Sequence, residues 1–147
     1  MLHQQRYRAE GKHAAACLLC PLDETERSIL LAEKLKIIPL GGLDEIGKNI
    51  TVLEYGKDMI VVDCGVGFPD EDMYGVDLVI PDFSYLVQNA KKLRGMFITH
   101  GHEDHIGSIP YCMQQVICPI HGTAMTNGLI KLKLEEHRLA ARVKLIT

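Results

Sequence analysis

The chain has 147 residues, 47% hydrophobic and 24% charged, which is enough apolar material for one globular domain with a core. Its net charge of −3 excludes a simple basic module for binding DNA or RNA, although bound metal ions would add positive charge. No apolar run approaches the roughly 20 residues of a transmembrane helix, and five scattered cysteines make a poor disulfide framework. We therefore expect a cytoplasmic protein with no membrane partner.

Residues 1–33 differ in character from the rest and are expected to form a flexible leader. A polar start is followed by the apolar stretch Ala14–Cys20 and by a short helix predicted over Asp23–Glu33. Cys17 and Cys20 have C-x-x-C spacing, but no second pair lies at zinc-ribbon distance. Two small apolar side chains are therefore favoured there over a metal or redox site.

From residue 34 the pattern becomes regular and predicts part of one domain over residues 34–147. The expected strands are Leu35–Leu40, Ile50–Tyr55, Met59–Asp63, Gly95–Thr99, Val116–Ile120 and one starting at Val143–Ile146, with a shorter extended piece at Val76–Ile80. The expected helices are Pro81–Ala90, Ile109–Gln115 and Ala124–Leu139. Strands that first meander and then alternate with helices predict an α/β (α+β) fold, a mixed sheet overlaid by helices.

Two segments of this domain carry more specific expectations. Met59–Val62 is an almost unbroken apolar run, which is typical of a strand buried on both faces. Gly41–Asn49 is rich in glycine but matches no phosphate-binding pattern, so a hairpin loop is expected. Because the sequence stops just after a strand has begun, we expect the domain to be incomplete and the chain to be a fragment.

Metal-ligand residue types are concentrated directly after the strand that ends near Thr99. His100, His102, Asp104 and His105 offer imidazole nitrogen and carboxylate oxygen, which are ligands that zinc accepts. Their spacing differs from the H-E-x-x-H helix that serves one metal, and Gly between the first two histidines permits a sharp turn. The loop could aim the first two residues one way and the last two another, which favours two metal ions over incidental surface histidines.

Four further residues are candidates for a role at or near this motif. Asp63 ends an apolar strand and is expected to orient a ligand imidazole, the alternative being that it merely opens the next turn. Glu103 is expected to be solvated or to support a ligand. His121, at a strand end, is expected to be structural, and His137 is expected to be solvated on a charged helix face.

The pattern H-x-H-x-D-H after a buried strand, preceded by Asp-x-Gly at another strand end, resembles the metallo-β-lactamase superfamily. The segments that resemble the ribonuclease J family within it are Leu40–Asn49, Val62–Gly65, Phe68–Glu71, Thr99–Gly107 and Leu129–His137. The resemblance covers residues 34–147 and implies an αββα sandwich, of which the N-terminal half would be present. It also implies a zinc-dependent β-CASP ribonuclease that cuts RNA internally and from 5′ to 3′, in RNA maturation and decay.

In this resemblance His100 and His102 would bind one zinc and Asp104 and His105 the other, with Asp63 in support. Manganese is an alternative metal, because mixed nitrogen and oxygen ligands accept either ion. The family completes its site with a further His, a bridging Asp and a distal His that this sequence lacks. We therefore expect the chain alone to be inactive and the full-length protein to act on RNA, as a homo-oligomer. The alternatives are another hydrolase of the same fold, acting on a thioester, lactone or small phosphodiester, and a truncated non-catalytic product.

Overall fold

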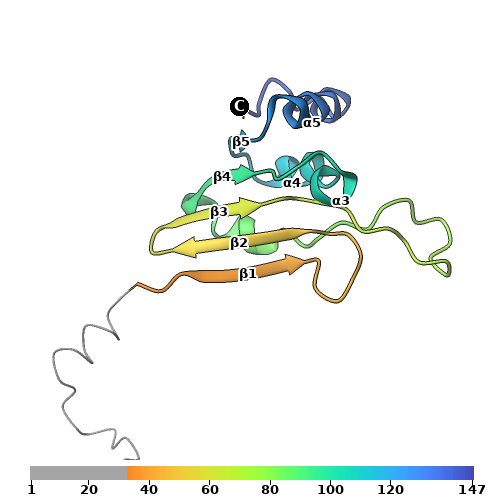
Figure 1. Ribbon diagram of the computed structural model, residues 1–147, viewed down its shortest axis with the longest axis horizontal. Helices are drawn as coiled ribbons and strands as arrows, with labels where there is room; N and C mark the ends of the chain where they lie inside the picture. Colours follow the sequence, from red (N-terminus) through yellow and green to blue (C-terminus); the bar gives the residue numbers. More distant parts are fainter. Residues whose placement is uncertain (1–32) are drawn as a thin grey trace, which may run out of the picture. The chain divides into compact units, whose positions relative to one another are not determined.

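The computed structural model describes residues 33–147, so the Cys17–Cys20 motif and all but the last residue of the expected helix at 23–33 lie outside the described residues. The described strands form one six-stranded sheet in which the spatial order follows the chain order (Figure 1). The strands are β1 Lys36–Gly41, β2 Ile50–Tyr55, β3 Asp58–Val62, β4 Leu93–Phe97, β5 Ile120–His121 and β6 Leu145–Ile146. The first three are antiparallel, and β3 to β6 run parallel.

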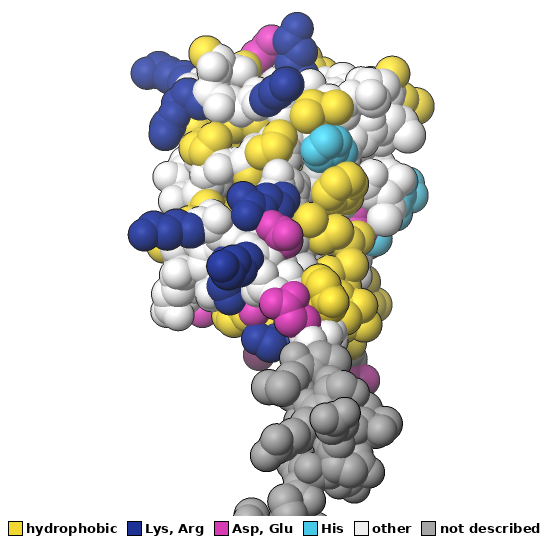
Figure 2. All heavy atoms as spheres, turned by 90° about the vertical axis from the view of Figure 1, so that its left-hand side faces the viewer, with side chains coloured by type: hydrophobic (Ala, Val, Ile, Leu, Met, Phe, Trp, Pro, Cys, Tyr) yellow, Lys and Arg dark blue, Asp and Glu magenta, His cyan; other side chains and the backbone are white. Residues whose placement is uncertain are grey.

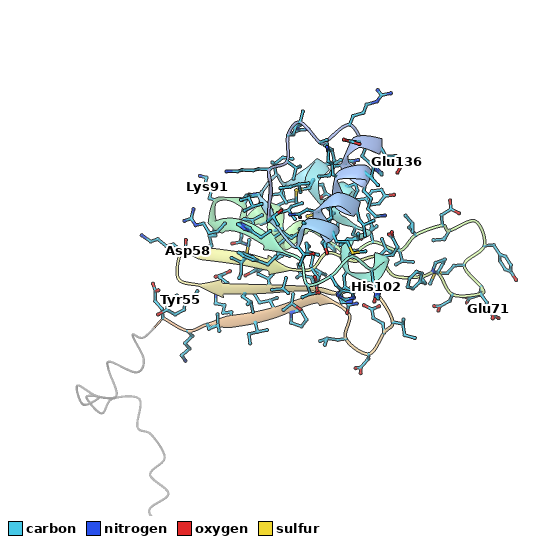
Figure 3. The ribbon with its side chains drawn as sticks, turned by 45° about the horizontal axis from the view of Figure 1, so that its top comes forward. Tyr55, Asp58, Glu71, Lys91, His102 and Glu136 are labelled. Atoms are coloured by element: carbon cyan, nitrogen blue, oxygen red, sulfur yellow. The ribbon has the colours of Figure 1, made fainter. Side chains whose placement is uncertain are left out.

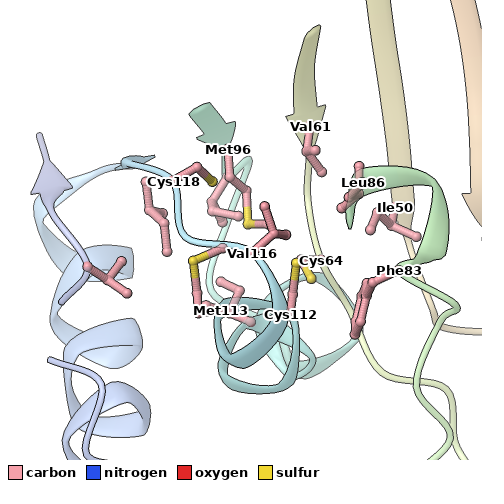
Figure 4. Packing of buried hydrophobic residues seen from close by; sticks show 14 of the residues in the cluster. Ile50, Val61, Cys64, Phe83, Leu86, Met96, Cys112, Met113, Val116 and Cys118 are labelled. Atoms are coloured by element: carbon pink, nitrogen blue, oxygen red, sulfur yellow. The ribbon is translucent and has the colours of Figure 1, made fainter. Parts of the chain in front are cut away.

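Helical segments fill the parallel connections. They are α2 Ser84–Gln88, the 3-10 helix η1 Ala90–Lys92, α3 Glu103–Ile106, α4 Ile109–Gln115 and α5 Ala124–Glu136. Their apolar side chains pack against one face of the sheet, and Figure 4 shows the centre of this core, with Leu86 of α2 and Met113 of α4 facing Val61 and Met96 of the strands. The α/β prediction is confirmed: this is a mixed sheet with a helical layer on one face.

The opposite face of the sheet carries apolar side chains that no described element covers. Ile37 is 65% exposed and Phe97 is 41% exposed, and the β3 residues Ile60 and Val62 are only half-buried. The prediction that β3 is buried on both faces is therefore wrong for the described residues. The alternating burial of β3 has a simple cause, since the helices lie on one side of the sheet only.

Element boundaries differ from expectation where side chains or unusual backbone conformations end a segment. The helix expected from Pro81 begins only at Ser84, because the Asp82 carboxylate accepts hydrogen bonds from the Ser84 amide (2.8 Å) and hydroxyl (2.6 Å) and forms a turn. Helix α5 ends at Glu136 and not at Leu139, because Arg138 adopts a left-handed conformation with φ of 58°. The α4 prediction of Ile109–Gln115 is confirmed as stated.

The expected strands also differ at their ends. Strand β4 starts two residues before the predicted Gly95, where Leu93 pairs with β3, and it ends at Phe97. Strand β5 is confined to Ile120–His121 and does not begin at Val116. The extended piece expected at 76–80 contributes a single bridge, between Val79 and Gly67.

The three cysteines of the described region, Cys64, Cys112 and Cys118, are buried free thiols in the core that the helices form with the sheet (Figure 4). Burial raises the pKa of Cys118 to about 12 and raises that of Cys64 well above its ordinary value. Cys64 and Cys118 therefore stay protonated and are not available as thiolate ligands. Within residues 33–147 no helix combines the length and the apolar character needed to span a membrane.

A group of charged side chains around the buried Glu54 stabilises the end of the sheet that faces the viewer in Figure 2, where basic side chains surround a few acidic ones. Glu54 is buried and accepts hydrogen bonds from the Tyr85 hydroxyl (2.7 Å) and from the ammonium groups of Lys36 (2.9 Å) and Lys92 (3.0 Å). Hydrogen bonds from Tyr85 and then from the two lysines lower the pKa of Glu54 from 4.5 to about 2. The carboxylate is thus ionised throughout the ordinary pH range.

Glu54→Gln is expected to destabilise the protein at neutral pH and to remove part of its acid sensitivity. The stabilisation from a carboxylate of depressed pKa is complete above about 4.5 and is lost as the pH falls to about 2. Thermal midpoints measured from pH 7 to pH 2 should therefore differ most between wild type and variant above pH 4.5 and converge below it. Glu136→Gln, at an exposed position on α5, is the control. A difference that does not change with pH would contradict the assignment.

Candidate metal centre

The histidine motif lies at the carboxyl ends of the parallel strands β3 and β4, remote from the β2–β3 turn. Figure 3 shows His102 at this end of the sheet and Tyr55 and Asp58 at the opposite end. Asp63 directly follows β3, and Thr99 and His100 are the second and third residues after β4. Because both strands point the same way, their carboxyl ends deliver these side chains to one place.

Asp63 is the anchor of the site. It is 6% exposed and adopts the left-handed conformation, with φ of 60°. One carboxylate oxygen accepts a hydrogen bond from the Thr99 amide (2.8 Å), and the other lies 2.9 Å from His105 Nδ1. Since a carboxylate only accepts hydrogen bonds, the proton of His105 sits on Nδ1, and Nε2 is left with a free electron pair.

Thr99, which the sequence analysis did not identify as a site residue, fixes the position of the ring proton in a second histidine. Its hydroxyl lies 2.8 Å from Asp63 Oδ2 and 3.0 Å from His100 Nδ1. If the hydroxyl donates its one proton to the carboxylate, its oxygen accepts from His100 Nδ1, which leaves Nε2 of that ring unprotonated as well. Asp63 therefore sets the tautomer of two imidazoles, one directly and one through Thr99.

The four predicted ligands form two adjoining pairs of donor atoms. His100 Nε2 lies 3.1 Å from His102 Nδ1, and His105 Nε2 lies 3.4 Å from Asp104 Oδ2. The ring centres of His100 and His105 are 4.1 Å apart, so the pairs are neighbours. Two ligands of one tetrahedral zinc, with bonds of about 2.0–2.1 Å, lie roughly 3.4 Å apart.

Each pair of donor atoms thus has the chemistry and the spacing to bind one metal ion. Within residues 33–147, no group of three or more His, Cys, Asp or Glu side chains is arranged to hold one ion. Two donors per ion leave each coordination shell half filled. The assignment of His100, His102, Asp104 and His105 as metal ligands remains a prediction, and so does the supporting role of Asp63.

Asn49 is a second residue that sequence reasoning did not identify. Its side-chain amide nitrogen lies 3.1 Å from the Asp104 carbonyl oxygen, 3.2 Å from Asp104 Oδ2 and 3.3 Å from His105 Nε2. It therefore contacts both members of the second pair. No local signal could have found it, because 55 residues separate Asn49 from Asp104.

Backbone hydrogen bonds join the motif to the end of β3. The Cys64 amide donates to the His105 carbonyl (2.8 Å), and the Val66 amide donates to the Glu103 carbonyl (3.2 Å). Gly65 lies between them, and a Cβ built on it would fall inside the Asp104 carbonyl group. The motif loop is thus held by main chain as well as by side chains.

Glu103, His121 and His137 lie outside the two pairs of donor atoms. Glu103 is exposed and forms an ion pair of 2.8 Å with Lys133 of α5. His121 stacks on Phe97 with ring centres 4.5 Å apart, on the uncovered sheet face. The prediction that His137 is solvated is wrong: it is half-buried, with Nδ1 3.0 Å from the Lys133 carbonyl oxygen. It follows the last residue of α5, where such a bond satisfies a free carbonyl group.

A cleft of about 340 Å³ opens beside the first pair. His100 and His102 form one wall, and Met125 and Leu129 from the start of α5 form the other. Leu129 packs so closely on Gly101 that a Cβ there would lie 2.7 Å from it. The cleft therefore lies between this pair and the first half of α5.

Comparisons of the sequence with known proteins find clear relatives. The chain is 48% identical to ribonuclease J of Synechocystis over 78% of its own length and 18% of that protein. It is 52% identical to ribonuclease J of Helicobacter pylori (strain 26695) over 71% of its length and 15% of that protein. The chain therefore spans less than a fifth of these two curated relatives.

Among solved structures, the short form of human tRNase Z matches with a TM-score of 0.47 and 17% identity, covering 76% of this chain and 46% of that one. The sequence model of the metallo-β-lactamase superfamily matches residues 43–139, which include β2 to β5 and the whole histidine motif. On that match, the chain belongs to the metallo-β-lactamase superfamily.

Proposed function

We propose that this chain is the N-terminal part of a ribonuclease that hydrolyses RNA phosphodiester bonds with two divalent metal ions. The superfamily implies the use of a divalent metal. The observation that carries the proposal is the bond from Asp63 to His105, because it turns the free nitrogen of that ring toward Asp104 beside the His100–His102 pair. The names of the curated relatives supply the substrate class.

Each of the site residues would have a specific role in holding the metal ions. His100 and His102 would hold one ion, and Asp104 and His105 the other, zinc being proposed with manganese as the alternative. When bound, such ions would lower the pKa of a nearby water molecule and offset negative charge on the phosphate oxygens. Asp63 and Thr99 keep protons on the Nδ1 atoms of His105 and His100, so that both Nε2 atoms stay free to bind.

The wider functional setting is also proposed. The parent protein would cut RNA internally and from the 5′ end, in RNA maturation and decay, as a cytoplasmic homo-oligomer. The buried free thiols of the described region favour a reducing compartment. The chain by itself would be catalytically silent, because each donor pair supplies only two ligands and a full shell needs more.

The test uses a 5′-phosphorylated RNA labelled at both ends, incubated with the purified 147-residue chain and zinc or manganese. We expect no cleavage above background. Robust cleavage that His102→Ala abolishes would refute the proposed inactivity of the chain while supporting its chemistry. A protein that extends the chain with the remainder of its gene should cleave the RNA and lose that activity on His102→Ala. An extended protein that hydrolyses a thioester or lactone and leaves RNA intact would overturn the proposed substrate.

A further inference from the structure

A second cavity, of about 600 Å³, lies between the β1–β2 loop and the long loop that follows β3. Figure 3 shows the loop after β3, which carries Glu71, projecting beyond the end of the sheet where His102 lies. The two loops are joined by a bridge between Gly47 and Gly67 and by a hydrogen bond from the Lys48 amide to the Val66 carbonyl (2.8 Å). The volume is in the range that holds a small organic ligand.

The cavity lies next to the candidate metal centre along the chain, through Lys48 and Asn49. Lys48 lines the cavity, with its stem so close to Gly67 that a Cβ there would lie 2.9 Å from the lysine Cγ. The next residue, Asn49, turns the other way and bonds Asp104 and His105. Neighbouring residues of the chain therefore contact the cavity and the Asp104–His105 pair, so a molecule bound at that pair would lie close to the cavity.

The apolar part of the lining is suited to a flat ring. Ile46, Phe68 and Met73 line the cavity and remain 87%, 57% and 41% exposed. Apolar side chains this exposed on neighbouring loops gain stability when a ligand covers them. An aromatic ring on one wall offers a stacking surface, and a methionine thioether also packs well against aromatic rings.

The charged part of the lining excludes phosphate and selects hydrogen-bond donors. Asp44, Glu45 and Asp70 line the cavity with Lys48 as the only basic residue. Lys48 is already paired with Glu45 at 2.7 Å, which leaves two carboxylates in excess. A phosphate group would meet like charge there, whereas an exocyclic amino group would find acceptors.

We propose that this cavity binds an amino-bearing nucleobase of the RNA strand, stacked on Phe68 with its amino group directed to Asp44 or Asp70. The proposal rests on the proposed function for the identity of the polymer. Adenine, cytosine and guanine carry the required amino group and uracil does not, so the cavity would make binding depend on the base at one position. The phosphates of the strand would pass outside the acidic lining.

The test titrates the ¹⁵N-labelled 147-residue chain with cytidine, adenosine or uridine in the presence of EDTA, and follows amide shifts by NMR. Cytidine and adenosine should shift the amides of residues 44–48 and 67–73 and bind several-fold more tightly than uridine. Phe68→Ala should weaken cytidine binding by about fivefold to a hundredfold, the range for loss of one base-stacking contact. Tyr74→Ala, at a 92% exposed ring of the same loop that does not line the cavity, should bind cytidine like wild type.

The preference for cytidine over uridine is tested with a second set of variants. Asp44→Asn and Asp70→Asn together should bring cytidine and uridine to nearly equal affinity, because an amide can donate to the uracil carbonyl groups. Equal binding of cytidine and uridine by wild type, or equal losses from Phe68→Ala and Tyr74→Ala, would overturn the proposal. Tighter binding of N-acetyl-arginine amide than of cytidine would overturn it in favour of a basic peptide. Nucleoside binding needs neither metal nor cleavage, so its failure leaves the proposed nuclease untouched, and the RNA assay can fail without affecting it.

Discussion

Gly65→Ala is expected to destabilise the protein by about 3 kcal/mol or more, at the upper end of what one added methyl group costs. The new Cβ would overlap the Asp104 carbonyl group and lie 2.8 Å from the His105 amide nitrogen. These are main-chain atoms, so relief requires the motif loop to move and not merely a side chain to rotate. The Gly65 amide also donates to the Asn49 carbonyl (3.0 Å), which fixes the glycine from the other side.

Urea unfolding followed by circular dichroism measures this effect, and α5 supplies a matched control. Gly128 is an exposed helical glycine with nothing within 4 Å of a built Cβ. Gly128→Ala should therefore stabilise the protein by about 0.5–1 kcal/mol through helix propensity. Similar effects of the two variants would show that the contact between Gly65 and the motif loop does not constrain the folded state.

Asp63→Asn is expected to weaken zinc binding about 10- to 100-fold with little change in the fold. Asparagine tolerates the left-handed conformation, and its carbonyl oxygen can still accept from the Thr99 amide. Its NH2 group would then face His105 Nδ1 and donate to it, which moves the proton of that ring to Nε2. A protonated Nε2 cannot bind a metal ion.

Competition with a chromophoric zinc chelator gives the affinity without any assay of catalysis. Asp77→Asn, at an exposed position in the loop after β3, removes the same charge and serves as the control. Zinc affinity should follow wild type in the control and fall in Asp63→Asn, while both variants keep their thermal midpoints near that of wild type. Equal affinity in wild type and Asp63→Asn would refute the role of Asp63 in orienting His105.

The sequence is most informative about the elements whose local patterns are strong. Strand β2 and helix α4 have the predicted bounds, because alternation in the first and a compact apolar segment in the second are local properties. Segments that end through a specific side chain or backbone conformation were predicted less well, as at Asp82 and Arg138. A short-range pattern does not reveal which carboxylate will accept from which amide, or which residue will be left-handed.

The candidate site divides in the same way. His100, His102, Asp104 and His105 stand out because they are adjacent in sequence, and their pairing in space follows from a short loop. Asp63 could be proposed from its position at a strand end, but its bond to His105 depends on the parallel pairing of β3 and β4. Asn49 and Thr99 were missed because each acts through a partner that only the folded sheet brings near.

The agreement between strand order and chain order bears on how the molecule can assemble. Within residues 33–147, each strand from β2 onward pairs with the one synthesised just before it, so the sheet can grow at its C-terminal side as the polypeptide leaves the ribosome. Among these strands, only β1 needs a later strand as its neighbour. The bonds that shape the metal centre can close once residue 105 has been made, after β1 to β4 and before β5 and β6; His105 donates to Asp63 and Asn49 donates to Asp104, across 42 and 55 residues. During synthesis we therefore expect β1 to β4 to pair first and the donor atoms to come together on that part of the sheet.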